Sequence, residues 1–225
     1  QLGNWLWDFA ARPLRDEEKV PENPNARQSR RGFSGTLYKT DAFLQTQPYG
    51  TVPAAFSADG KIGVFESNSI LRAVARSGSA EHGLYGRSPM QASRIDSFLD
   101  ATLVFGREAQ VYLLGISEIS AELHQRMAGA FEFFLEGIEQ ALRHHDYVAG
   151  DELTIADIAF ACDFSQFMRE RLMRGGLDAA SLPLVSEGAE NTYPRAFAHL
   201  YRLIEQPEFV EYLGKYTEHL LSERS

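Results

Sequence analysis

The sequence predicts a small mixed α/β domain over residues 1–78, followed by an all-α domain over residues 88–225. Two observations support this division. An Asp-Gly pair between two short apolar runs predicts a β-hairpin in the first part, and apolar side chains at helical spacing dominate the chain after a loop at residues 79–88. The length of 225 residues lies between one and two typical domains, which agrees with one small and one larger domain.

The composition favours a globular protein and excludes several kinds of partner and site. Hydrophobic residues make up 44% of the chain and charged residues 24%, which is typical of a globular protein. The net charge of −9 gives no overall positive field, so nucleic acid is not an expected partner. The chain has no run of about 18 apolar residues, so no membrane span is expected. The single cysteine, Cys162, excludes internal disulfides and cysteine-rich zinc sites, and it fits a cytoplasmic location.

The beginning of the chain is predicted to be helical. Apolar side chains in the first fifteen residues suit one face of a helix, which Pro13 would kink or end early. We expect that the first strand of the domain, which would ordinarily precede such a helix, is missing. Residues 16–35 are polar and contain two prolines, so they are predicted to form a loop.

The hairpin is predicted from residues 52–56 and 62–65, because Gly60 between them can adopt the positive φ of a tight turn. The second apolar run continues directly into a helix, for which Ser67 is the predicted N-cap and Gly78 the predicted stop. The apolar face of this helix is predicted to consist of Ile70, Leu71, Val74 and Ala75.

The second domain is predicted to be a bundle of helices. Apolar residues recur at steps of three and four over residues 89–115 and 120–145. Further helices are predicted to begin at Thr154 and to span residues 193–205 and 207–222. Thr154 and Asp157 form the pattern of a capping box, in which each side chain binds a backbone N–H at the start of a helix. We interpret this box as structural, because the residues after it are apolar nearly all round.

Two segments of the first domain could bind a ligand. If the bond between Val52 and Pro53 is cis, Val52 turns its backbone N–H and C=O outward, where they can pair with a peptide-like molecule; an ordinary trans turn is the alternative. Glu66 and Ser67 lie where a helix begins, and its unpaired N–H groups and dipole suit a carboxylate. Glu66 could pair with an ammonium group, whereas Ser67 could also be a simple cap.

Taken in order, four segments resemble the cytosolic glutathione transferase superfamily: PYGTVP, the Asp-Gly hairpin, FESNSILRAVAR and YVAGDELTIADIAFA. The segments GNW, VFESNSI and IEQPEFVEYLG are most similar to the N-terminal module of the elongation factor 1 gamma subunit, a subtype that some fungal and bacterial transferases share.

This resemblance implies a thioredoxin-like N-terminal domain, an all-α C-terminal domain and glutathione as co-substrate. It implies a cis bond before Pro53, with Val52 binding the cysteinyl backbone of glutathione. Glu66 and Ser67 would hold the γ-glutamyl end, and Lys39 and Thr51 the glycine end.

The resemblance leaves the catalytic group open. Members of the superfamily activate the thiol with a Tyr, Ser or Cys after the first strand, whereas the first candidate position here holds Asn4. Its amide could donate a hydrogen bond to the thiolate or cap the first helix, or the true donor could precede Gln1. Cys162 is predicted to be buried and inert, and no metal site is expected at His144 and His145.

The pocket for the second substrate is predicted from aromatic residues of the helical domain. Phe105, Tyr112 and Phe167 lie on helices that could face it, although side chains with this spacing also suit a core.

The resulting hypothesis is a glutathione transferase whose glutathione thiolate attacks a small hydrophobic electrophile, by conjugation or by ether cleavage that forms a thioether. The alternative is a non-catalytic interaction module of the elongation factor 1 gamma type. A homodimer is expected, and a heterodimer with one active partner remains possible.

Overall fold

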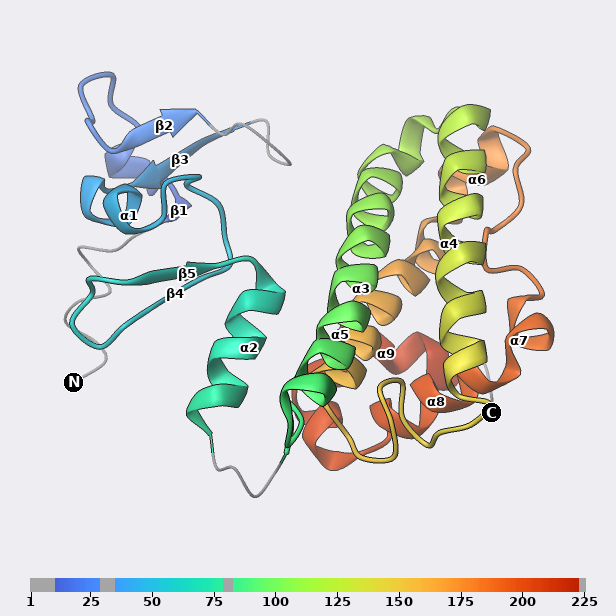
Figure 1. Ribbon diagram of the computed structural model, residues 1–225. Helices are drawn as coiled ribbons and strands as arrows, with labels where there is room; N and C mark the ends of the chain where they lie inside the picture. The colour runs from blue at the N-terminus through green and yellow to red at the C-terminus, as the bar shows by residue number, and fades with distance from the viewer. Residues whose placement is uncertain (1–10, 29–34, 79–82, 223–225) are drawn as a thin grey trace. The chain divides into compact units, whose positions relative to one another are not determined.

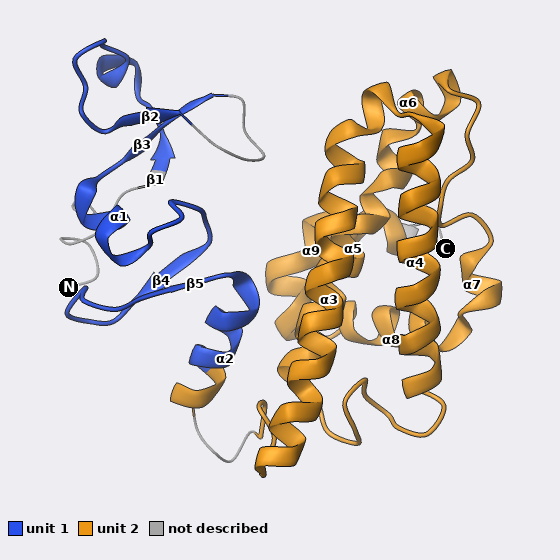
Figure 2. Ribbon diagram, turned by 45° about the horizontal axis from the view of Figure 1, so that its top comes forward, with its two compact units in different colours: residues 1–74 blue, residues 75–225 orange. Residues whose placement is uncertain are grey.

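The computed structural model describes residues 11–28, 35–78 and 83–222. The chain divides into two compact units, residues 1–74 and residues 75–225 (Figure 2). This boundary lies within helix α2 (Ser67–Ser77), whereas the predicted boundary lies in the loop that follows it.

The first unit begins with a three-stranded antiparallel sheet of order β1-β3-β2 (Figure 1). Its strands are β1 (Ala11–Pro13), β2 (Ala26–Gln28) and β3 (Thr36–Lys39), and the short 3-10 helix η1 (Asp16–Glu18) follows β1. The prediction of a helix over the first fifteen residues is therefore wrong for Ala11–Pro13, which form a strand paired with β3. Residues 1–10, the rest of that prediction, lie outside the described part of the chain. The loop predicted for residues 16–35 contains β2, which also pairs with β3.

The sheet is followed by a short helix and the predicted hairpin. Helix α1 (Asp41–Thr46) begins at Thr40, whose hydroxyl accepts a hydrogen bond from the amide of Phe43 at 3.2 Å. Strands β4 (Ala54–Phe56) and β5 (Gly63–Phe65) pair antiparallel, and Gly60 takes the expected positive φ of 70° in the turn. The hairpin prediction is confirmed.

For helix α2, the predicted C-terminal end is confirmed and the predicted N-cap is wrong. It ends at Ser77, directly before Gly78. Ser67 is its first helical residue, so Glu66, whose carbonyl accepts from the amide of Ile70 at 3.1 Å, occupies the position predicted for the Ser67 cap. Val74, predicted for the apolar face, is 62% exposed.

The named elements among the described residues of the second unit are all helices, and loops connect them (Figure 1). The predicted long helices correspond to α3 (Pro89–Gly115), α4 (Ala121–Ala141), α5 (Ile155–Met168), α8 (Pro194–Ile204) and α9 (Pro207–Ser222). Four short elements were not predicted: η3 (Ile116–Glu118), η4 (Arg169–Met173), α6 (Arg174–Ala179) and α7 (Ala189–Thr192). Helix α3 packs against both α4 and α5, and α5 also packs against α8 and α9.

The predicted capping box is present, and it belongs to a larger buried network. Asp157 is fully buried and accepts hydrogen bonds from the amides of Thr154 and Val148, both at 2.9 Å. His199 on α8 lies 2.9 Å from the same carboxylate through Nε2, while its Nδ1 lies 2.8 Å from the Arg202 guanidinium. Because Arg202 can only donate, Nδ1 is the acceptor and Nε2–H donates to Asp157. One carboxylate thus joins the loop before α5, the start of α5 and α8.

We predict that Asp157→Ala lowers the free energy of unfolding by about 3 kcal/mol or more, because it leaves several buried donors without an acceptor. Urea denaturation measures the change. Asp151→Ala is the matched control, since Asp151 is exposed and, within the described part of the chain, pairs with His145 alone; it should change stability by less than about 0.5 kcal/mol. Equal stability of the two variants would contradict the structural role of Asp157.

Candidate functional site in the first unit

The turn before β4 exposes a backbone segment. The bond between Val52 and Pro53 is cis, which settles the alternative that the sequence left open. Val52 is 56% exposed, and its N–H and C=O have no hydrogen-bond partner among the described residues. Gly50, two residues earlier, has a φ of 63°, a conformation that favours glycine. The turn therefore presents one donor and one acceptor of the main chain to a ligand.

This turn is held by a side chain that the sequence analysis did not identify. Gln47 is fully buried, and its Oε1 accepts hydrogen bonds from the amides of Tyr49 (2.8 Å) and Gly50 (2.9 Å). Its Nε2 donates to the carbonyl (2.6 Å) and the hydroxyl (2.8 Å) of Thr51. Glutamine has no strong turn preference, so the only signal in the sequence was a polar residue directly before a Pro-x-Gly turn.

The hairpin register brings the turn to the start of α2. Ala54 pairs with Phe65, so one further step of the same register places Pro53 opposite Glu66. Glu66 has a φ of 66°, a left-handed conformation that is strained for a residue with a side chain and that often occurs at functional sites. Four of the predicted ligand residues, Val52, Pro53, Glu66 and Ser67, therefore lie together.

Of the two residues predicted for the glycine end of glutathione, Thr51 lies in the turn itself and Lys39 lies beside Gly50. Lys39 on β3 is 9% exposed, and its Nζ lies 3.4 Å from the position that a Cβ on Gly50 would take. Thr51 accepts the hydrogen bond from Gln47, which leaves its own hydroxyl hydrogen for another partner. Asn4, the predicted catalytic residue, lies outside the described residues.

The residues predicted for a substrate pocket lie in the core of the second unit. Phe105, Tyr112 and Phe167 are at most 2% exposed, and the Phe167 ring lies beside both others, with its centroid 5.5 Å from that of Phe105 and 6.2 Å from that of Tyr112. The Tyr112 hydroxyl donates to buried Glu170 at 2.9 Å, and burial raises the pKa of Tyr112 far above its ordinary value. The structure thus shows the core packing that the sequence left as the alternative.

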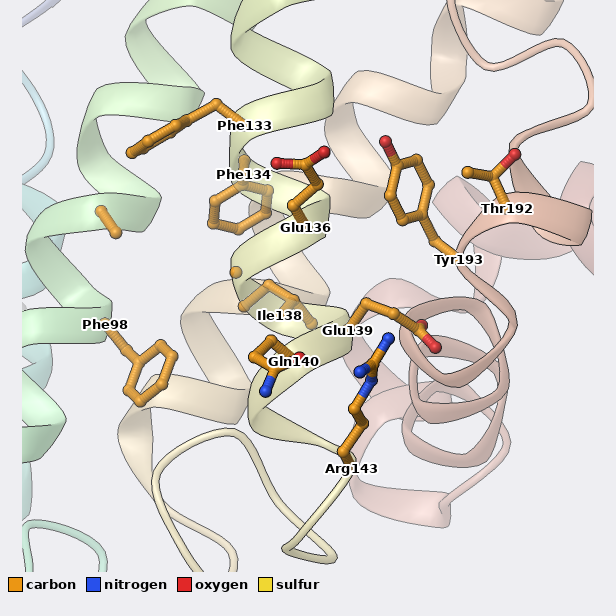
Figure 3. Close-up of a pocket in the computed structure, with 12 residues that line it drawn as sticks. Phe98, Phe133, Phe134, Glu136, Ile138, Glu139, Gln140, Arg143, Thr192 and Tyr193 are labelled. Atoms are coloured by element: carbon orange, nitrogen blue, oxygen red, sulfur yellow. The ribbon is translucent and has the colours of Figure 1, made fainter.

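A pocket of about 670 Å³ does occur in the second unit, at a different place (Figure 3). Its lining residues include Phe98 from α3, Phe133 from α4 and Tyr193. Figure 3 shows Phe98 and Phe133 on one side of α4 and Tyr193 on the opposite side. Phe133 is 78% exposed at this pocket. None of the residues predicted for substrate binding lines it.

The prediction that Cys162 is buried is wrong. The residue is exposed on α5. Although part of the residue is exposed, protein atoms surround the sulfur, and this desolvation raises the pKa of the thiol to about 11. The negative charge of the neighbouring Asp163 makes a smaller contribution in the same direction. Burial likewise raises the pKa of Asp163 to about 6, and its carboxylate lies 3.3 Å from the Cβ position of Gly106 on α3. The thiol is therefore mostly protonated near neutral pH.

The described ranges, residues 11–28, 35–78 and 83–222, contain no cluster of three or more His, Cys, Asp or Glu side chains arranged for a metal ion. His145, which follows α4, pairs with Asp151 at 2.9 Å. Within the same ranges, no helix combines the length and the apolar character needed to span a membrane.

Comparison with known proteins identifies the family. Residues 96–207 match the model of the glutathione S-transferase C-terminal domain. The chain is 28% identical over 185 residues to elongation factor 1-gamma 2 of Oryza sativa subsp. japonica, an alignment that covers 80% of this chain and 40% of the relative. The chain belongs to the cytosolic glutathione transferase superfamily. It is also 27% identical to the glutathione S-transferase-like protein LUC7 of Fusarium sp., over 78% of this chain and 76% of that protein.

A solved structure confirms the fold class of this glutathione transferase superfamily member. The glutathione S-transferase-like protein from Lodderomyces elongisporus superposes with a TM-score of 0.62 and 23% identity, over 76% of each chain. The predicted thioredoxin-like domain followed by an all-α domain is therefore confirmed. The chain spans about 40% of the length of the elongation factor relatives that it matches.

We predict that Cys162 reacts slowly with iodoacetamide, because only the thiolate is nucleophilic. At pH 8 the rate should be about tenfold or more below that of free glutathione, and it should rise steeply towards pH 11. Since the chain has one cysteine, mass spectrometry of the whole protein reports this site alone. Asp163→Asn should accelerate the reaction at pH 9 by removing a nearby negative charge; alkylation as fast as that of glutathione would contradict the raised pKa.

We also predict a pH-dependent gain in stability for Asp163→Asn. The folded-state pKa of about 6 lies above the value of about 3.9 for an unfolded aspartate, so the charged carboxylate destabilises the fold above pH 6 and has no such effect below about pH 4. The variant should therefore unfold at higher urea than the wild type at pH 7, and at nearly the same urea at pH 4. Asp178→Asn, an exposed substitution with the same charge change, should show no such pH dependence.

Proposed function

We propose that this chain binds glutathione at the Val52 turn and transfers its thiolate to a small hydrophobic electrophile. The observation that carries the proposal is the exposed Val52 backbone next to a cis proline, with both main-chain groups lacking a partner among the described residues. The Val52 N–H can donate to the cysteinyl carbonyl of glutathione, and the Val52 C=O can accept from the cysteinyl N–H. Such a pair of bonds is the smallest form of strand addition.

The γ-glutamyl end of glutathione carries an ammonium and a carboxylate on one carbon. Glu66 supplies a carboxylate for the ammonium, and the first N–H groups of α2 and the Ser67 hydroxyl suit the carboxylate. Lys39, whose Nζ lies close to Gly50, and Thr51 in the same turn are our candidates for the glycine carboxylate. This arrangement would hold the anionic ligand by local dipoles and hydrogen bonds. The net charge of −9 is spread over the chain and screened by salt, so it does not prevent such short-range contacts.

The proposed reaction is a nucleophilic substitution. The thiol of glutathione loses its proton, the sulfur forms a bond to an electrophilic carbon, and the leaving group departs with the electron pair of the broken bond. A thiol with the ordinary pKa of about 8.5 is only a few per cent ionised at pH 7, so a hydrogen-bond donor that lowers this pKa increases the rate. Asn4 remains our candidate for that donor.

The alternative function is a protein-interaction module without catalysis. It is favoured by elongation factor 1-gamma relatives such as those of Oryza sativa and Arabidopsis thaliana, which match 80% of this chain at 28% and 25% identity. A stable macromolecular partner recovered from cell extract, together with no turnover of glutathione and an aryl chloride, would support this alternative. We further propose a homodimer in the cytoplasm; sedimentation of the purified chain distinguishes it from a monomer that requires a second, different chain.

We predict that the wild-type chain binds glutathione in isothermal titration calorimetry and that Glu66→Gln weakens binding about tenfold. The substitution keeps the size of the side chain but removes the charge that faces the ammonium, and tenfold corresponds to about 1.4 kcal/mol. Glu22→Gln is the control, because Glu22 is an exposed loop residue of the same unit and carries the same charge. The absence of binding by the wild type at millimolar glutathione would refute the proposed function.

A further inference from the structure

Gln47 links the interior of the first unit to the proposed ligand site. It follows α1 directly and is fully buried, and its side chain contacts three successive residues of the turn, Tyr49, Gly50 and Thr51. We propose that Gln47 is a positioning residue for glutathione, which fixes the direction of the Val52 N–H without touching the ligand. This inference rests on the proposed function.

The side-chain amide of Gln47 uses its full hydrogen-bonding capacity. A primary amide offers two acceptor lone pairs and two donor hydrogens. Oε1 accepts from two backbone amides, those of Tyr49 and Gly50, and Nε2 donates to the two oxygens of Thr51. A carboxylate of the same size could replace only the acceptor half, and an apolar side chain could replace neither half.

The bond from Nε2 to Thr51 acts on Val52 through the peptide group that the two residues share. The carbonyl of Thr51 and the N–H of Val52 belong to one planar peptide unit, in which the two bonds point in opposite directions when the unit is trans. The Thr51 oxygen is held at 2.6 Å from Nε2 of a fully buried side chain. The Val52 N–H therefore points away from Gln47. Hydrogen bonding to the carbonyl also polarises the peptide unit and makes its N–H a better donor.

The turn is constrained from a second side at Gly50. A Cβ at this position would lie 3.0 Å from the Leu44 side chain and 3.4 Å from the Nζ of Lys39, and the φ of 63° already disfavours other residues. The Gly50 amide also donates to the backbone carbonyl of Gln47 at 3.0 Å. Gln47 thus binds Tyr49, Gly50 and Thr51 in succession, and Gly50 is packed against Leu44, so a change at residue 47 should reach Val52.

The experiment compares glutathione affinity in Gln47→Met and Gln47→Glu. Met approximates the size of Gln but removes all four side-chain hydrogen bonds, and we expect the Kd for glutathione to rise at least tenfold. In a turnover assay, the KM for glutathione should rise by a similar factor, while kcat at saturating glutathione changes less than threefold. Such a split is expected of a residue that positions the binding group and takes no part in the chemical step.

Gln47→Glu provides a readout that general destabilisation would not mimic. At pH 7 a buried carboxylate would face the Thr51 carbonyl without a hydrogen to donate, so binding should weaken. Protonation at pH 5 restores one donor, and burial raises the pKa of such a carboxyl group. The affinity of this variant should therefore recover towards that of the wild type as the pH falls, whereas Gln47→Met should not recover.

Matched controls lie two residues away. Gln45 is exposed on α1, so Gln45→Met and Gln45→Glu make the same chemical changes without touching the turn and should bind glutathione as the wild type does. If Gln47→Met fails to fold by circular dichroism, Gln47→Glu at the two pH values carries the test. Wild-type affinity in either folded Gln47 variant at pH 7, or no recovery of Gln47→Glu at pH 5, overturns the inference alone. No binding by the wild type overturns the proposed function, and the inference with it.

Discussion

The loops of this protein depend on buried side chains that each bind a pair of backbone amides. A buried N–H without a partner costs about as much as a lost hydrogen bond, so each loop that turns inside the protein needs an acceptor. Asp157 supplies it for Val148 and Thr154, and Glu170 for Val185 and Ser186. Glu139 supplies it at the start of α8, where the amides of Arg195 and Ala196 are otherwise unpaired.

Gln47 has the same role in the first unit but differs in charge. It too binds two amides, those of Tyr49 and Gly50. Asp157, Glu139 and Glu170 accept hydrogen bonds from backbone amides and from Tyr, Thr, His and Arg side chains, so these three positions are served by an acceptor alone. The turn at Gly50 also presents the Thr51 carbonyl to residue 47, so this position requires donors and acceptors together. A neutral amide satisfies that requirement, and it leaves the outward N–H of Val52 as the unpaired end of the same peptide unit.

The sequence predicted those parts of the molecule in which one local pattern determines the structure. The long helices follow from a spacing repeated over many residues, and the capping box and the hairpin turn follow from short-range chemistry. The three-stranded sheet was missed because its strands have only three or four residues and pair with partners far along the chain. The exposure of Cys162 was missed because nearly all of α5 is apolar, so periodicity cannot show which side faces outward. Gln47 was missed because its function depends on where the amides of a folded turn point.

The proposed site also explains how an acidic chain can hold an anion such as glutathione. At physiological ionic strength, charges more than about 8 Å apart on the surface are largely screened from each other, whereas a hydrogen bond of about 3 Å is not. In the proposed site the Val52 backbone and the start of α2 would provide directed donors at that short range, and the carboxylate of Glu66 would pair with the one positive group of the ligand. If glutathione binds as proposed, the net charge of −9 would oppose its approach more than its final binding, and the geometry of the turn would control the affinity.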